Sequence, residues 1–192
     1  MKKFPVVLDL ETKHTFRDFK EHKDLGISVV AIYDYKSSQA RTFLEGELNE
    51  LFPILESCSY IIGYNINSFD IPVLAPYYAG NVTHFSSFDL LEDIRAKLGR
   101  RLALNDLISA TLNIKKSGHG LMAIDLYKEG KFEELASYCA DDVKVTKELF
   151  EYGIRTGEIF YLDETGKQSI KVNWKKYLEE DSGNDMPLTL PF

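Results

Sequence analysis

Apolar residues recur along the chain with two different spacings, and each spacing predicts one kind of element. Runs rich in β-branched and aromatic residues are typical of strands, and they occur at 4–10, 27–35, 40–44, 59–63 and 83–88. Apolar residues three and four positions apart are typical of amphipathic helices, and they occur at 47–57, from about 70, and at 89–98, 103–112 and 131–152. Three strands come first, joined by short connections, and helices and strands alternate afterwards. This order predicts an α/β fold with a mixed β-sheet flanked by helices.

The pattern changes after Gly157. Two alternating runs, EIFYL and SIKVNW, flank the turn DETGKQ, and this arrangement predicts a C-terminal β-hairpin. We expect residues 1–156 to form the main domain, 157–178 to form a hairpin extension of that domain, and 179–192 to be a flexible, polar tail. The hairpin is expected either to cover the sheet or to guide substrate through Tyr161 and Trp174.

Composition limits the classes of protein that fit. A chain of 192 residues with 44% hydrophobic residues is long enough for one well-packed core. Cys58 and Cys139 lie in apolar surroundings, and neither a signal peptide nor a long apolar run is visible, so we expect a reduced, cytoplasmic protein that does not enter a membrane. His14, His22 and His84 have no partners at metal-ligand spacing, and no Ser-His-Asp or Cys-His arrangement is present.

Two carboxylates share one face of the first strand. In VVLDLET, residues 6–12, Asp9 and Glu11 are two positions apart, and side chains at that spacing on a strand point the same way. Neighbouring carboxylates repel each other unless a cation lies between them, so this pair indicates a metal site. The alternative is a solvated strand end, because charged residues are mostly exposed.

Another carboxylate follows the strand at 59–63. In GYNINSFDIPVL, residues 63–74, Asp70 opens a helix, while Asn65 and Asn67 tolerate unusual backbone angles and can bond neighbouring amides. Helix capping would also explain Asp70, and capping does not exclude metal binding. Asp89 also follows a strand, and we expect it to cap the next helix rather than to be a fifth acid of the site.

A phenol and a carboxylate lie one turn apart on the helix at 131–152. Tyr138 and Asp142, in SYCADDVKVTKELFEYG (137–153), are four positions apart and therefore share one helix face. Both side chains could then act on the same water molecule, although Asp141 is an alternative to Asp142. The alternative to a catalytic role is that Tyr138 is an ordinary core aromatic residue beside a surface acid.

These three motifs, in this order, resemble those of the DEDD superfamily of 3′→5′ exonucleases, the DnaQ-like enzymes, in the DEDDy branch that has Tyr in its third motif. GYNINSFDIPVL is especially similar to the second exonuclease motif of the proofreading domains of family B DNA polymerases. The resemblance covers roughly residues 4–155 and implies a ribonuclease-H-like sheet. Because no polymerase domain accompanies the motifs, we expect a free-standing nuclease or a subunit.

The resemblance implies that Asp9, Glu11, Asp70 and Asp142 hold two divalent ions and that Tyr138 orients the attacking water. Two cations about 3.5–4 Å apart can stabilise both ends of an in-line phosphodiester displacement. Hard oxygen ligands suit Mg²⁺ or Mn²⁺, whereas zinc sites favour sulfur and nitrogen. A phenol titrates at about pH 10, so Tyr138 is expected to position the water rather than deprotonate it.

Candidate substrate-binding residues lie in the loops. A net charge of −7 is unusual for a nucleic-acid enzyme, but residues 95–119 carry six basic side chains against one acidic side chain. The basic residues are Arg95, Lys97, Arg100, Arg101, Lys115 and Lys116. We expect this segment, with Asn65, Asn67 and the loop residue His119, to contact a single-stranded DNA or RNA 3′ end. A solvated helix face and a plain turn histidine are the alternatives.

The last six residues, PLTLPF, resemble the short peptides by which bacterial replication and repair proteins bind the sliding clamp. Leu190 and Phe192 match the hydrophobic anchors, whereas Pro187 stands where those peptides usually carry Gln. Such a tail would increase processivity by tethering. The alternative is that the tail folds back on the domain.

The sequence therefore predicts a metal-dependent 3′→5′ exonuclease that releases nucleoside 5′-monophosphates, with direction and product implied by the resemblance. Two alternatives remain open: a non-catalytic nucleic-acid-binding or assembly subunit that retains the fold, and a phosphohydrolase that acts on small nucleotides. The presence of all five expected catalytic side chains disfavours the first alternative. The choice between DNA and RNA depends on contacts to the 2′-hydroxyl and stays open.

Overall fold

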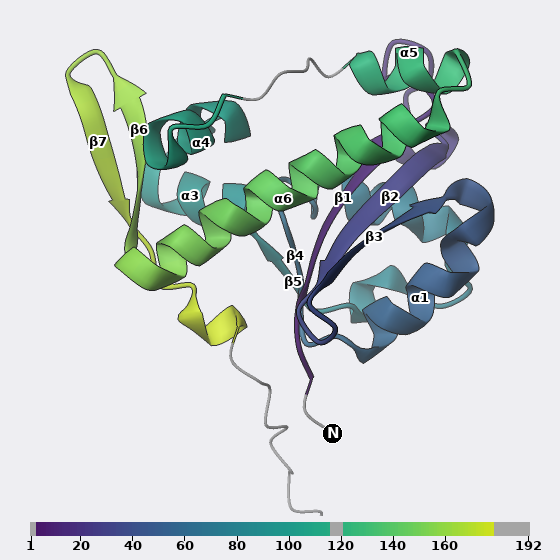
Figure 1. Cartoon of the computed structure of the whole chain (residues 1–192), viewed down its shortest axis with the longest axis horizontal. Coiled ribbons are helices and arrows are strands. Elements are labelled where there is room, and N and C mark those ends of the chain that lie inside the picture. Colours follow the sequence, from purple (N-terminus) through teal and green to yellow (C-terminus); the bar gives the residue numbers. More distant parts are fainter. Residues whose placement is uncertain (1–2, 116–120, 179–192) are drawn as a thin grey trace, which may run out of the picture.

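A computed structural model of the chain, which describes residues 3–115 and 121–178, shows a mixed five-stranded sheet with helices on both faces (Figure 1). The strand order is β3-β2-β1-β4-β5. The strands are β1 (Val6–Thr12), β2 (Ile27–Asp34), β3 (Gln39–Leu44), β4 (Ile61–Gly63) and β5 (Ser87–Asp89). β2 pairs antiparallel with both β1 and β3, whereas β4 is parallel to both β1 and β5. The predicted α/β fold with a mixed, helix-flanked sheet is confirmed.

The side-chain alternation of β1 determines which side of the sheet each residue enters. Val6, Leu8 and Leu10 pack in one core with helix α1 (Leu48–Ser57), whereas Val7 packs in the other core with helix α6 (Phe132–Thr156). Asp9 and Glu11 follow Val7 at intervals of two and therefore face α6. The same period that builds the core thus directs both carboxylates toward the crossing helix.

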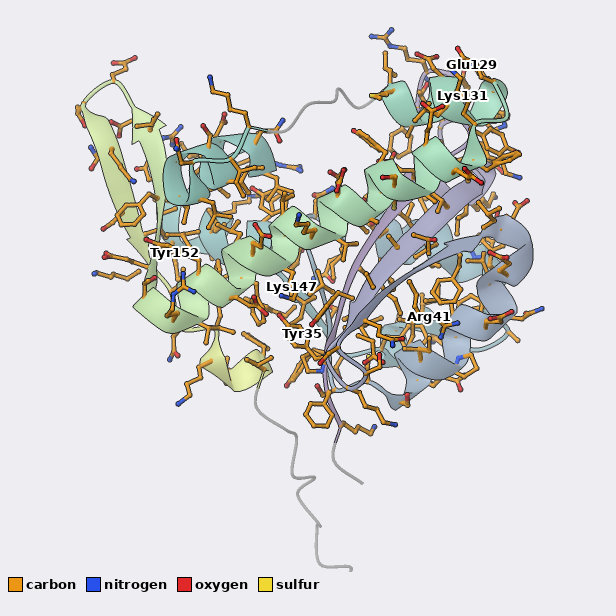
Figure 2. All side chains as sticks on the ribbon, in the orientation of Figure 1. Tyr35, Arg41, Glu129, Lys131, Lys147 and Tyr152 are labelled. Atoms are coloured by element: carbon orange, nitrogen blue, oxygen red, sulfur yellow. The ribbon has the colours of Figure 1, made fainter. Side chains whose placement is uncertain are left out.

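Helix α6 lies diagonally across the sheet and is tied to it by polar as well as apolar contacts. Lys147 of α6 lies beside Tyr35 in Figure 2 and over the ring of Tyr33, 4.6 Å from its centroid, and it forms an ion pair with Glu151. The hydroxyl of Tyr35 donates to Glu151 at 3.2 Å. The remaining α-helices of the described ranges are α2 (Asp70–Leu74), α3 (Leu90–Leu98), α4 (Leu104–Leu112) and α5 (Met122–Lys128).

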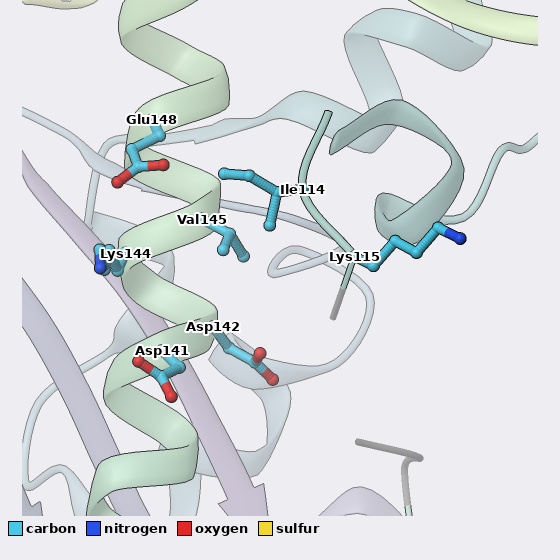
Figure 3. Close-up of a pocket in the computed structure, with 7 residues that line it drawn as sticks. All are labelled: Ile114, Lys115, Asp141, Asp142, Lys144, Val145 and Glu148. Atoms are coloured by element: carbon cyan, nitrogen blue, oxygen red, sulfur yellow. The ribbon is translucent and has the colours of Figure 1, made fainter. Parts of the chain in front are cut away.

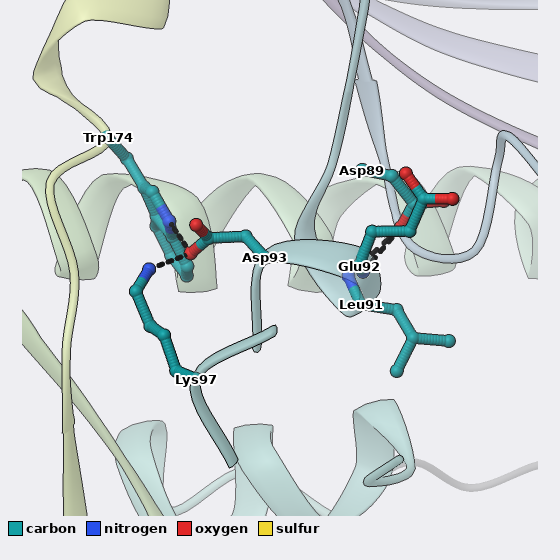
Figure 4. A network of polar contacts seen from close by, with 6 residues as sticks. All are labelled: Asp89, Leu91, Glu92, Asp93, Lys97 and Trp174. Carbon is teal, nitrogen blue, oxygen red and sulfur yellow. Dashed lines mark hydrogen bonds and ion pairs between the residues drawn. The ribbon is translucent and has the colours of Figure 1, made fainter. Parts of the chain in front are cut away.

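The predicted hairpin is present as strands β6 (Glu158–Asp163) and β7 (Gly166–Lys171), joined by a two-residue turn. It packs on α4, where the Thr111 hydroxyl bonds both the amide and the carbonyl of Phe160. After the hairpin, Trp174 is 1% exposed, stacks on Phe150 and donates its indole N–H to Asp93 at 2.8 Å (Figure 4). The expectation that Trp174 guides substrate is therefore wrong, because its ring belongs to the core.

Three local features differ from the sequence predictions. The connection from β1 to β2 is not short but spans residues 13–26 and contains the 3-10 turn His22–Asp24. The run 83–88 forms the 3-10 turn Val82–His84 before the short strand β5, because the Asn81 side chain accepts the amide of Thr83 and caps that turn. Helix α5 was not predicted, since its seven residues are too few to show a helical period.

No helix within 3–115 or 121–178 is long and apolar enough to cross a bilayer. The tail 179–192, with the predicted clamp-binding residues Leu190 and Phe192, lies outside the described residues, as do Lys116 and His119.

Candidate active site

Three carboxylates from two elements meet on the α6 side of the sheet. Asp9 and Glu11 of β1 and Asp142 of α6 each offer an oxygen atom, and these atoms lie within 4.8 Å of one another. Asp142 is 5% exposed, whereas Asp9 and Glu11 are half-buried. Such a group of hard oxygen donors fits Mg²⁺ or Mn²⁺ better than zinc, and no histidine or cysteine of the described residues joins it.

The thiol of Cys139 contacts Asp9, one of these carboxylate residues. Its Sγ donates to the backbone carbonyl of Asp9 at 3.4 Å and lies 3.8 Å from Asp9 Oδ2. Burial raises the pKa of the Cys139 thiol well above its ordinary value, and the charges of Asp9, Glu11 and Asp142 raise it further. Cys139 therefore stays a neutral thiol that packs against the site rather than a nucleophile.

Asp70 reaches the same strand from the second motif. Its Oδ1 accepts the amide of Leu10 at 3.0 Å, and Leu10 lies between Asp9 and Glu11. Burial raises the pKa of Asp70 to about 7, backbone hydrogen bonds partly offset that rise, and the charge of Asp89 adds to it. The N-cap position of α2 belongs to Phe69, so the Asp70 side chain is committed to β1 rather than to capping.

The second motif approaches β1 closely because Gly63 ends β4. A Cβ at position 63 would collide with the side chain of Ile66 and lie 2.7 Å from the carbonyl oxygen of Leu8. Asn65 then turns the chain with a φ of 68°, a left-handed conformation that Asn tolerates better than most residues. Glycine and asparagine at these positions thus allow the loop to carry Asp70 back onto the first strand.

Asp89 caps helix α3 as expected, but it also holds the loop of the second motif. Its Oδ1 accepts the amides of Leu91 at 2.9 Å and of Asn65 at 2.8 Å, and its Oδ2 accepts the amide of Asn67 at 3.0 Å. Figure 4 shows the capping end of this network. Burial raises the pKa of Asp89 despite these bonds. The sequence indicated the cap but not the link to the loop, because that link joins residues 22 and 24 positions apart.

The predicted substrate-binding residues divide into two groups. Arg101 reaches the second motif, where its Nη2 donates to the side chain of Asn65 at 2.8 Å, and Arg100 lies over the ring of Tyr161. By contrast, the Asn67 side chain is bonded to Glu92 and Ser87, which makes it a structural residue of the loop. Lys97 pairs with Asp93 beside Trp174 (Figure 4).

Lys115 contributes to a cavity beside the carboxylates. The cavity has a volume of about 220 Å³, and Asp142 lines it together with Ile114, Lys115 and Val145. Figure 3 shows Asp142 projecting from α6 toward the segment that carries Ile114, and Asp141, Lys144 and Glu148 of α6 also line the cavity. The exposed ammonium group of Lys115 thus lies at the edge of the site rather than in it.

A mixed sheet in this strand order, with acidic residues on its central strand and on the helix across it, defines the ribonuclease-H-like class of α/β proteins. The model of the RNase_H superfamily matches residues 6–154, and the chain therefore belongs to that superfamily. None of the curated proteins compared with the chain matches it.

Two solved structures have the same fold. One is RNase D of Trypanosoma brucei, with a TM-score of 0.57 and 16% identity; the match covers 78% of this chain and 57% of that one. The other is the family B DNA polymerase of the archaeon Pyrobaculum calidifontis, with a TM-score of 0.58 and 17% identity; the match covers 78% of this chain and 24% of that one. The ribonuclease-H-like superfamily and fold that the motif resemblance implies are confirmed. The chain spans little more than half of the first protein and about a quarter of the second.

Proposed function

We propose that the chain is a metal-dependent 3′→5′ exonuclease that releases nucleoside 5′-monophosphates from single-stranded ends. The observation that carries this proposal is the convergence of Asp9, Glu11 and Asp142 within 4.8 Å in an RNase H fold. The kinship of that fold with an RNase D and a DNA polymerase favours a nucleic-acid substrate. Asp9, Glu11, Asp70 and Asp142 would hold two Mg²⁺ or Mn²⁺ ions.

Such ions, when bound, acidify water and neutralise charge that develops on the phosphate. The chain's own residues then have separate tasks. Asp9 and Glu11 offer carboxylate oxygens from β1, and Asp142 offers one from α6 on the opposite side of the site. Asp70 keeps its carboxylate at β1 through the amide of Leu10. Tyr138, one helical turn before Asp142, orients the attacking water by a hydrogen bond.

Side chains other than the carboxylates would position the single-stranded nucleic acid. Arg101 and Asn65, already joined to each other, present a guanidinium next to the second motif, and a guanidinium can bind a phosphate through two donors. Lys115 adds a positive charge at the edge of the cavity that Asp142 lines. These cations offset part of the acidity of the chain where the phosphates would lie.

The test is digestion of 5′-labelled single-stranded DNA and RNA of equal sequence with Mg²⁺ or Mn²⁺. Wild type should give a ladder that shortens from the 3′ end, and Asp9→Asn and Asp142→Asn should each reduce the rate about a hundredfold or more. Glu133→Gln is the matched control, since this exposed carboxylate in the first turn of α6 neither belongs to the cluster nor lines the cavity and should leave the rate unchanged. Tight binding without cleavage by wild type would instead indicate a non-catalytic nucleic-acid-binding subunit.

The dependence of the rate on substrate length separates an exonuclease from a phosphohydrolase of small nucleotides. An exonuclease with phosphate contacts beyond the scissile bond should cut a 10-mer more efficiently than a dinucleotide. Hydrolysis confined to mononucleotides and dinucleotides would contradict the proposal and support the small-nucleotide alternative.

A further inference from the structure

Three lysine side chains meet at a surface cavity between α3 and the chain that leaves the hairpin. The cavity has a volume of about 330 Å³, within the range of about 300–1,000 Å³ that is typical of ligand pockets. Lys97 belongs to α3, Lys171 is the last residue of β7, and Lys176 belongs to the 3-10 turn Lys175–Tyr177. This cavity is called the lysine pocket, and its other lining residues include Asp93, Asn173 and Tyr177.

The walls of the lysine pocket are attached to the core of the protein. Tyr177 stacks on Phe88 of β5 with the ring centroids 3.7 Å apart, and Val172, which also lines the pocket, is 7% exposed. On the side of α3, Asp93 accepts the indole N–H of the buried Trp174. Both segments that carry the lysines are therefore held by buried residues, and the cavity between them is preformed.

The charge of the lysine pocket suits a phosphate group. Three ammonium groups line it against one carboxylate, that of Asp93, on a chain whose net charge is −7. Asp93 already pairs with Lys97, and Lys171 pairs at 2.8 Å with Glu158, which does not line the pocket. Ion pairs at the surface contribute little to stability, so these ammonium groups can turn toward a phosphate at small cost. The side-chain amide of Asn173 is a further hydrogen-bond donor.

The lysine pocket and the loop of the second motif lie on opposite sides of α3. Figure 4 shows Asp89 and Glu92 on one side of this helix and Asp93, Lys97 and Trp174 on the other. No residue that lines the pocket belongs to the carboxylate cluster. A ligand in the pocket would therefore be held apart from the candidate active site.

The exposure of the lysines favours a phosphate of a polymer over a free small molecule. The side chain of Lys171 is 81% exposed and that of Lys97 is 34% exposed, so the pocket is open to solvent. Pockets for small molecules usually bury most of the ligand surface. An open pocket instead suits a phosphate whose chain continues on both sides.

We propose that the lysine pocket binds a backbone phosphate of the nucleic-acid strand, on the 5′ side of the end that lies at the carboxylates. The inference rests on the proposed function, because it takes a polynucleotide as the substrate, and it assigns a second anchor for that strand. Contacts to phosphates carry no sequence information directly, so this anchor accepts any sequence.

The first experiment measures affinity for a fluorescent single strand of about 20 nucleotides by anisotropy, in an Asp142→Asn background so that the strand is not cut. A phosphate contact contributes about 0.7 to the slope of log Kd against log salt concentration, which corresponds to about fivefold in affinity at about 0.1 M salt. Lys171→Gln and Lys176→Gln should each lower the affinity and the slope by about these amounts, and the double variant should bind about 25-fold more weakly.

Two kinds of control variant accompany this measurement. Lys171→Arg and Lys176→Arg keep the charge and should retain the affinity. Lys36→Gln removes an exposed lysine from the turn between β2 and β3, away from the pocket, and should change neither affinity nor slope. An equal loss in Lys36→Gln and in the pocket variants would overturn the inference, because it would show an effect of net charge alone.

The second experiment distinguishes a backbone phosphate from a free one. A single methylphosphonate, which removes the charge of one phosphate, is moved along the strand. At one position it should weaken binding to protein with both lysines and add little to the loss already caused by the double variant. Losses that add at every position would overturn the inference.

Inorganic phosphate and a nucleoside 5′-monophosphate are titrated in parallel by calorimetry, and neither should bind at micromolar concentrations. Lysine-dependent binding of either one, with strand affinity unchanged in the double variant, would overturn the assignment to the backbone and indicate a site for a free nucleotide or phosphate.

Binding and cleavage together separate this inference from the proposed function. Unchanged strand affinity in the double variant, with cleavage by wild type intact, would refute the lysine pocket and leave the exonuclease proposal standing. Lysine-dependent binding of a strand that wild type does not cut would refute the exonuclease proposal and leave the pocket standing. Tighter binding by the double variant would also refute the pocket, and would indicate that its lysines hold the acidic run 179–181, which lies outside the described residues.

Discussion

Replacing Asp70 by Asn should stabilise the metal-free protein while it abolishes the activity. Asp70 is buried, and its Oδ1 accepts the amide of Leu10, a bond that the carbonyl oxygen of Asn can also accept. The substitution therefore keeps the link to β1 and removes only the charge. In the absence of a cation, a buried carboxylate beside Asp89 is unfavourable, because burial penalises the ionised form.

The size of the effect follows from the pKa. The pKa of Asp70 is about 7 in the folded chain, against 3.8 for the free side chain, and at 1.36 kcal/mol per pKa unit the ionised form lowers the free energy of unfolding by at most about 4 kcal/mol. Below pH 3.8 both states are protonated and the penalty is absent. It grows as the pH rises from 3.8 to 7, since the unfolded chain releases its proton first, and it is constant above pH 7.

Urea unfolding in EDTA measures this difference, and the single tryptophan, Trp174, reports it because its ring is buried against Phe150. Asp70→Asn should be more stable than wild type at pH 8 and the advantage should shrink toward pH 5, whereas Asp141→Asn, an exposed control, should show no such trend. Adding Mg²⁺ should raise the stability of wild type and not that of Asp70→Asn. An Asn variant that is less stable than wild type at pH 8, or equally stable, would refute the reasoning.

Three further changes test the framework around the site. Asp89→Ala leaves the amides of the loop 65–67 and of the α3 N-terminus without their acceptor, so it should lower the free energy of unfolding by about 2–4 kcal/mol and reduce kcat, as urea titration and strand digestion would measure. Gly153→Ala places a Cβ 2.5 Å from the Trp174 ring. Although Ala has the higher helix propensity, the substitution should destabilise the chain by about 1–3 kcal/mol without a change in kcat. A rise in Tm would contradict the close packing of Gly153 against Trp174. Arg101→Gln should weaken oligonucleotide binding and reduce the dependence of log Kd on log salt concentration by about one, and an unchanged salt slope would place the phosphates elsewhere.

Local periodicity predicted which face of its own element each carboxylate of the first and third motifs occupies. The alternation of β1 puts Asp9 and Glu11 on the α6 side, and the helical period of α6 puts Asp142 on the face toward the sheet. Both periods are properties of single elements and can be read without knowledge of the fold. The prediction required only that the helix cross the strand, and the family resemblance supplied that arrangement.

Contacts between distant segments could not be predicted in the same way. The bond from Leu10 to Asp70 spans 60 positions and depends on the close approach to β1 that Gly63 permits, and the link from Asp89 to the second motif spans 24 and 22 positions. Trp174 looked like a candidate substrate contact because an aromatic residue near a chain end gives no local sign of burial. In each case the deciding quantity is the packing of one element on another, which has no period in the sequence.

Helix α6 also fixes the distance and the relative orientation between Asp142 and the packing site of the C-terminal segment at Gly153. Asp142 and Gly153 lie eleven positions apart on it, which is about three turns, so both face nearly the same side of the helix. One inserted residue between them would turn Gly153 by about 100° and carry the Trp174 contact away from the core. Insertions should therefore be tolerated in the connection 13–26 or in the hairpin turn. The interval from Asp142 to Gly153 should keep its length in any chain that retains both the Asp142 carboxylate and the contact of Gly153 with Trp174.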